Sequence, residues 1–244
     1  MRNKISKVNT LAALAALAGA MAAGTAALPT AAAGVIGTLT NVPTNSISSP
    51  INISTGAADW IYFYGVTTPT TPDYKSGGPA SFSRLSAIAS GSVSEGLGTT
   101  TDGIYLSFSG GTPDASAIAD SSTLYSYGEK FTQTLFGPSE TVQIYLMNYI
   151  TNCNLSASLS SGGTSYSVAN TAMSGGTNET GLLTLNVTGS IGDILTFSDT
   201  AVSPSGNNSV NIQAASATVA PEPTALALLA MAGMGLLLLR RRRA

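Results

Sequence analysis

The sequence predicts an all-β protein: an antiparallel β-sandwich of the jelly-roll-like type over residues 34–219, flanked by an N-terminal signal peptide and a C-terminal transmembrane helix. Residues 34–219 show no helical periodicity, and their apolar residues fall in short or alternating runs. Glycine pairs at 77–78, 110–111, 162–163 and 175–176 separate these runs as turns do. Many short strands at regular spacing are typical of a sandwich, and this length suits one domain.

Nine segments are predicted as strands: 35–40, 59–66, 103–109, 130–136, 140–149, 154–159, 182–188, 193–198 and 209–219. The alternation is clearest in 140–149, where Val142, Ile144 and Leu146 define a core face. The opposite face, with Tyr145, is expected to carry partly exposed side chains. Residues 65–79 contain three prolines and few large aliphatic residues, so they are predicted as a long loop.

Composition excludes several classes of protein. The 244 residues include no histidine and one cysteine, which excludes a Ser-His-Asp triad, a histidine-ligated metal and an intrachain disulfide. Charged residues are 9% of the chain, and residues 34–219 hold three basic and eleven acidic residues, a net charge of −8. So acidic a body is not expected to bind nucleic acid.

The N-terminus has the layout of a secretory signal peptide, predicted over residues 1–33. Arg2, Lys4 and Lys7 precede an alanine- and leucine-rich run, and Ala31-Ala32-Ala33 fits the small-residue rule for cleavage. Cleavage is expected after Ala33, with a position between 22 and 27 as the alternative. An anchor that stays uncut is disfavoured because the run is shorter than the roughly 20 residues that a span needs.

The C-terminus, residues 220–244, combines three elements in a fixed order. Pro221, Glu222 and Pro223 precede an uncharged apolar segment, predicted as a transmembrane helix over about 224–239. Four basic residues follow it: Arg240, Arg241, Arg242 and Arg243. Arginines in that position hold their end on the cytoplasmic side, so the body is expected outside the membrane.

The triplet, short helix and arginine cluster together resemble the PEP-CTERM sorting signal. Pro221, Glu222 and Pro223 match its triplet, and the four arginines match its basic end. The resemblance implies that a membrane-embedded exosortase recognises the tail. It also implies processing at the cell envelope of Gram-negative bacteria that produce exopolysaccharide. An ordinary C-terminal anchor that is never cleaved is the alternative.

The body is also similar to an uncharacterised β-sandwich domain of secreted bacterial proteins. The similarity rests on Asp59-Trp60, 105–109 with Gly111-Thr112-Pro113, 141–146, 155–160 and 208–215. Gly110 stands where that family's pattern has an aspartate, and no activity accompanies the resemblance.

One strand carries candidate ligand contacts. Trp60, Tyr62 and Tyr64 alternate with Ile61 and Phe63, so one face of the strand is predicted to show three aromatic rings. With Tyr74 on the following loop, these rings could stack on sugars. The favoured interpretation is that Trp60 is a large core residue and that the tyrosines lie at sheet edges.

The acidic residues predict neither a catalytic pair nor a metal ligand set. A calcium site could use Asp59, Asp73, Asp102, Asp193 or Asp199, but no calcium-binding loop motif occurs. A glycosidase needs only two carboxylates, yet no recognisable motif places a pair. We therefore expect no catalytic residue and no cofactor, with calcium left open.

Together these features predict an exported, non-catalytic protein of the cell surface or extracellular matrix. Its expected partners are an exosortase, the inner membrane through the tail before processing, and exopolysaccharide. A lectin-like carbohydrate-binding module and a secreted carbohydrate-active enzyme with the same tail are the alternatives.

Overall fold

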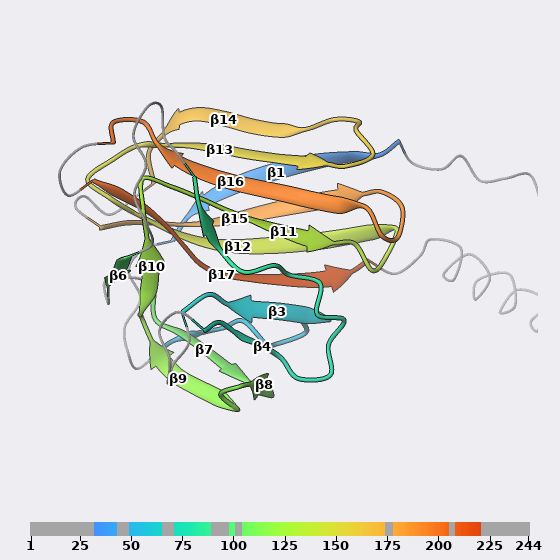
Figure 1. Ribbon diagram of the computed structural model, residues 1–244, viewed down its shortest axis with the longest axis horizontal. Coiled ribbons are helices and arrows are strands. Elements are labelled where there is room, and N and C mark those ends of the chain that lie inside the picture. The colour runs from blue at the N-terminus through green and yellow to red at the C-terminus, as the bar shows by residue number, and fades with distance from the viewer. Residues whose placement is uncertain are drawn as a thin grey trace, which may run out of the picture. The chain divides into compact units, whose positions relative to one another are not determined.

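A computed structural model describes residues 32–42, 49–64, 71–88, 98–100, 104–173, 178–204 and 208–220 (Figure 1). Within these ranges every regular element is a β-strand. The all-β class predicted from the sequence is therefore confirmed.

The first of two large sheets has seven strands in the order β1-β15-β12-β17-β3-β4-β8, and all its pairings are antiparallel. The strands are β1 (Gly34–Asn41), β15 (Asn178–Thr188), β12 (Ser139–Tyr149), β17 (Ser209–Val219), β3 (Asp59–Tyr62), β4 (Asp73–Lys75) and β8 (Gly111–Thr112).

The second large sheet has five strands in the order β14-β13-β16-β11-β5, also antiparallel. The strands are β14 (Tyr166–Thr171), β13 (Cys153–Leu159), β16 (Ile194–Ala201), β11 (Gly128–Thr134) and β5 (Ser86–Ala87).

Eight of these strands follow jelly-roll topology, which confirms the predicted sandwich type. In chain order they are β3, β11, β12, β13, β14, β15, β16 and β17. The first of them pairs with the last, the second with the seventh, the third with the sixth, and the fourth with the fifth. This nested pairing wraps a long hairpin into two facing sheets.

A smaller third sheet combines one strand that precedes β3 with two strands from the chain between β4 and β11. It has the order β2-β7-β9, from β2 (Ile51–Asn52), β7 (Leu106–Ser109) and β9 (Ser116–Asp120), and β2 pairs with β7 in parallel. A separate two-stranded sheet joins β10 (Thr123–Tyr125) to β6 (Gly98–Thr100). Figure 1 shows β7 and β9 beside the β3–β4 end of the seven-stranded sheet.

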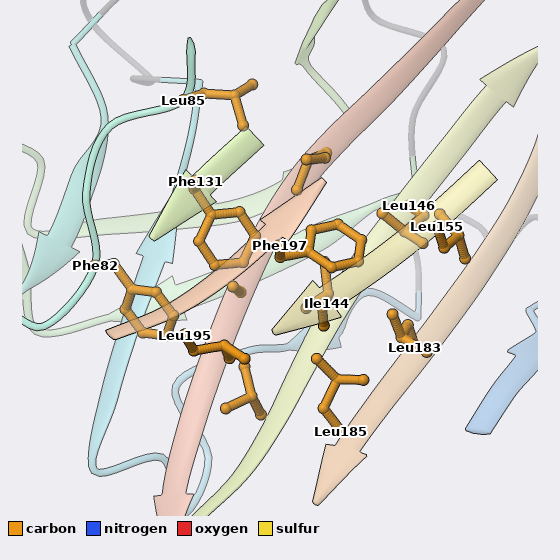
Figure 2. Packing of buried hydrophobic residues seen from close by; sticks show 14 of the residues in the cluster. Phe82, Leu85, Phe131, Ile144, Leu146, Leu155, Leu183, Leu185, Leu195 and Phe197 are labelled. Atoms are coloured by element: carbon orange, nitrogen blue, oxygen red, sulfur yellow. The ribbon is translucent and has the colours of Figure 1, made fainter. Parts of the chain in front are cut away.

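The main core lies between the two large sheets. Figure 2 shows Phe131 and Phe197 of the five-stranded sheet among Ile144, Leu183 and Leu185 of the facing sheet. Phe131 contacts Phe197 with a ring-centroid distance of 5.5 Å. Along each strand these inward-facing residues alternate with outward-facing ones, as in other sandwiches.

The predicted strands coincide with observed strands except at their ends. Predicted segment 209–219 matches β17 in full, and 103–109 is shortened to Leu106–Ser109. The predicted 65–79 loop is wrong in part, because Asp73–Lys75 forms β4. The sequence analysis did not identify β2, β5, β6, β8, β9, β10 and β14, and six of these strands have five residues or fewer. The 175–176 glycine pair lies outside the described residues.

Ala33, at the predicted cleavage position, is packed against the turn between β13 and β14. Its carbonyl oxygen accepts a hydrogen bond from the Thr164 amide at 3.4 Å, and the Val35 amide donates to the Thr164 carbonyl oxygen at 2.9 Å. A Cβ atom on Gly163 would lie 2.1 Å from the Ala33 oxygen. The close approach of these two backbones therefore requires glycine at 163.

Substitution of each of two neighbouring glycines tests this contact. Gly162 and Gly163 have φ angles of 83° and 92°, but a Cβ on Gly162 would meet nothing within 4 Å. We expect Gly162→Ala to reduce the free energy of unfolding by about 1 kcal/mol through backbone strain alone. Gly163→Ala should cost clearly more in any chain that retains Ala33. Denaturant unfolding measures both costs, and intact mass shows whether Ala33 is present. Equal costs in a chain with Ala33 would contradict the contact.

Candidate functional site

The aromatic strand β3 is buried on both of its faces. Ile61 and Phe63 point into the main core, with exposed fractions of 0% and 1%. Trp60 and Tyr62 point the other way and are also 0% exposed, because the third sheet covers that face. The predicted open face of three rings is therefore wrong for Trp60 and Tyr62, and the interpretation of Trp60 as a core residue agrees with its burial.

Trp60 lies at the centre of this second core, between β3 and the small sheet. Its ring centroid is 4.7 Å from that of Phe108 on β7. A Cβ on Gly111 would lie 2.9 Å from the Trp60 ring, so glycine in β8 allows the indole to fit. The indole nitrogen is buried and has no hydrogen-bond partner within the described part of the chain. Packing, not a polar contact, thus holds the Trp60 indole.

Tyr62 links β3 to the segment that precedes β10. Its hydroxyl donates to the Ser122 carbonyl oxygen at 2.6 Å. The Gln213 Nε2 on β17 donates to the same Ser122 carbonyl at 3.4 Å. Gln213 also binds the residue at 104, ahead of β7: its Oε1 accepts from the Ile104 amide at 2.9 Å, and its Nε2 donates to the Ile104 carbonyl at 2.6 Å. Burial, with the nearby Asp120 charge, raises the pKa of Tyr62 far above its usual range. Tyr62 is therefore a neutral structural donor.

The four aromatic residues predicted as possible glycan contacts do not form one exposed surface. Tyr64 and Tyr74 are half-buried, and both pack against the main core. Trp60 and Tyr62 have no accessible ring face on which a sugar could stack.

Removal of the indole should therefore act on stability. We expect Trp60→Ala to lower the free energy of unfolding by roughly 3–5 kcal/mol, as for large aromatic truncations in cores. Tyr62→Phe keeps the ring and loses one buried hydrogen bond, so it should cost about 1 kcal/mol. Unfolding in denaturant, followed by circular dichroism, compares the two variants. A Trp60→Ala protein that keeps its midpoint but loses binding to a glycan array would instead support the lectin-like alternative.

Three of the aspartates considered for calcium are occupied by hydrogen-bond donors. Asp59 accepts from the Trp60 amide and from the Ser81 amide and hydroxyl, and Asp73 accepts from the Asp114 amide. Asp193 accepts from the Ser190 amide and the Ser161 hydroxyl, and these bonds lower its pKa. Asp102 lies outside the described residues. These contacts are those of carboxylates that order loops and turns.

Asp199 and Glu129 form a different kind of pair. They are direct cross-strand neighbours on β16 and β11, they face the main core, and both are 0% exposed. The Glu129 Oε2 accepts from the Ile212 amide at 2.7 Å, whereas its Oε1 has no partner among the described residues. Neither Asp199 oxygen accepts a bond from an N–H or O–H group of the described residues. Burial raises the pKa of Asp199 to about 8 and that of Glu129 well above its usual range.

Cys153 and Asn148 complete this polar end of the core. The Cys153 thiol interacts with both Asp199 and Asn148, and burial raises its pKa well above the usual range. It is therefore an inert thiol at neutral pH. Within the described ranges, no group of three or more cysteine, aspartate and glutamate side chains is arranged to hold a metal ion. Sequence reasoning missed this pair, although the alternation Glu129, Phe131, Gln133 places Glu129 on the core face.

The pair predicts a pH-dependent stability with a defined sign. A carboxyl whose pKa is raised by folding stabilises the protein fully below its unfolded pKa of about 3.9. That stability is lost as the pH rises through the folded value, which for Asp199 is about 8. The free energy of unfolding should thus fall between about pH 4 and pH 8, and Asp199→Asn should flatten the decline.

Asp193→Asn is the matched control, because Asp193 lies outside the core and the bonds from Ser190 and Ser161 lower its pKa. It should leave the slope between pH 5 and pH 8 unchanged. Denaturant midpoints at several pH values measure all three proteins. A wild-type profile that stays level over this interval would contradict the raised pKa values.

The residues predicted for sorting cannot be placed in this structure. Pro221, Glu222, Pro223, the 224–239 segment and Arg240 to Arg243 lie outside the described residues, as does the predicted signal peptide up to residue 31. In the described portion of the chain, no helix has the length and hydropathy needed to cross a membrane.

The fold and its buried residues define a jelly-roll β-sandwich with an added third layer. A scan of protein-family models finds no match to the chain. A search of curated proteins finds none either.

Proposed function

We propose that this chain is an exported, non-catalytic protein of the cell surface or extracellular matrix, sorted by an exosortase through its C-terminal tail. The observation that carries the proposal is the order of the tail: Pro221-Glu222-Pro223, an apolar segment and four arginines, in a chain whose first 33 residues are predicted to be a signal peptide. The low charge and the abundance of hydroxyl and amide side chains suit contact with hydrated exopolysaccharide.

The ends of the body support this topology. Gly34 pairs with Thr188, Thr188 pairs with Ser139, and the Ser139 carbonyl oxygen accepts from the Ala220 amide. The first and last residues of the sandwich thus lie at one end of the same sheet, with two strands between them. Figure 1 shows β1 beginning and β17 ending on the same side of the molecule. In a body built in this way, the apolar segments predicted before residue 34 and after residue 220 can lie at one membrane surface.

A non-catalytic role is supported by the state of the acidic residues. A glycosidase needs two carboxyls that reach a substrate. Glu129 and Asp199 lie next to each other, but both are enclosed in the core. Asp59, Asp73 and Asp193 bind the protein's own donors. A carbohydrate-active enzyme with the same tail stays the alternative from another class.

Replacement of the triplet tests the sorting proposal. We expect the Pro221→Ala, Glu222→Ala and Pro223→Ala triple variant to accumulate as an unprocessed, membrane-held form, because the recognition element is lost while the apolar segment and arginines stay. Cell fractionation and intact mass of the product measure this. The matched control is Thr224→Ala, which changes the next residue and keeps the triplet, and which should be processed normally. Normal processing of the triple variant would mean that the tail is a plain anchor.

A further inference from the structure

The four edges of the two large sheets differ in how well they are protected against pairing with another chain. An exposed edge strand offers unpaired backbone N–H and C=O groups, and proteins usually block it by shortness, charge, proline or a bulge. Edges β8 and β5 have two residues each. Edge β14 is interrupted by a register shift against β13 and by Asn170, whose φ is 51°.

Edge β1 has none of these protections. Its eight residues, Gly34–Asn41, contain no charge and no proline, and they pair with β15 without a register shift. The Val35 amide points away from β15, since it donates to Thr164. By the alternation of a strand, the backbone groups of Gly37, Leu39 and Asn41 point the same way, toward the side of β1 on which no strand of the described residues pairs with it. On the outer face the Ile36 side chain is 70% exposed, so a neighbouring molecule could cover it.

The segments nearest β1 contain little charge, and two acidic residues lie at their borders: Glu179 at the start of β15, and Asp193, which accepts from Ser161. No charged residue occurs in 33–42, in 153–171 or in 180–188, which include β1, β13, β14 and nearly all of β15. All eleven acidic residues of the body lie outside these segments. Two copies of a body with a net charge of −8 repel each other over most orientations, and the repulsion is weakest when these neutral sides face each other.

We propose that β1 pairs antiparallel with β1 of a second copy of this chain, joining two seven-stranded sheets across a two-fold axis. Residues 34 and 35 are held by Thr164, so the free part of the edge is centred on Leu39. With the axis at Leu39, Gly37 of each copy forms a hydrogen-bonded pair with Asn41 of the other, and Thr38 lies opposite Thr40 without backbone bonds. Such a contact is self-complementary, as a two-fold interface requires.

This register gives a sharp test in the full chain. Side chains opposite each other in a non-hydrogen-bonded pair are close enough for a disulfide, with Cα atoms about 4.5 Å apart. Differently tagged Thr38→Cys and Thr40→Cys chains are produced together, solubilised in mild detergent, and treated with a thiol oxidant. We expect a covalent heterodimer well above the yield of either homodimer. The native Cys153 is buried and should not contribute.

The matched control uses Ser156→Cys with Ser158→Cys. These exposed residues have the same spacing on β13, which is enclosed between β14 and β16. These variants should give no preferred heterodimer, although the chains have the same tail.

As a second measurement, Thr38→Lys with Thr40→Lys should reduce co-purification of two tagged copies through like-charge repulsion. Equal cross-linking of the β1 and β13 pairs, or co-purification that the lysines leave unchanged, would overturn the proposal. Because oxidant is added and sorting is not measured, either result is independent of export and exosortase processing.

Discussion

The architecture depends on burying both faces of the strand pair β3 and β17. In most sandwiches a sheet has one core face and one solvent face, so apolar and polar residues alternate along each strand. Here the third sheet covers the outer face, and all four residues of β3 are buried. β17 supplies small partners: Ala214 lies opposite Tyr62 and Ser216 opposite Trp60. Large rings on one strand against small residues on the other let two cores share a single sheet.

A single bulge in β17 connects the layers by hydrogen bonds. The register with β12 shifts between Tyr145 and Leu146, which leaves Gln213 as the extra residue. Its side chain binds both backbone groups of Ile104, while the preceding Ile212 amide is bound by Glu129 from the opposite sheet. The bulge thus binds Ile104, ahead of β7, on one face of the seven-stranded sheet and Glu129 of the five-stranded sheet on the other. Because Glu129 is buried beside Asp199, this connection is also the part of the core that is sensitive to pH.

The distribution of charge gives the body two different sides. The strands β3 and β4 contain the buried carboxylates of Asp59 and Asp73, which accept from local donors. Glu140, at the start of β12, accepts from the Phe136 and Gly137 amides. The edge strands β1 and β14, by contrast, contain neutral residues only. An acidic protein with one neutral, unblocked edge is suited to ordered contact between copies, since that edge is where backbone hydrogen bonds are available and repulsion is lowest.

The sequence alone determined the fold class and most long strands, because alternation in segments such as 140–149 and 182–188 follows from the two-residue repeat of a strand. It also supplied the predictions for both chain ends, which depend on local composition. Only the tertiary structure decided which faces are exposed. Tyr145 was expected on a partly exposed face and Tyr62 at a sheet edge, yet they are 4% and 0% exposed because the third sheet covers them. The Glu129–Asp199 pair likewise depends on strand pairing between residues 70 positions apart. Local pattern gives the direction of a side chain, whereas its neighbours are set by long-range packing that no short segment encodes.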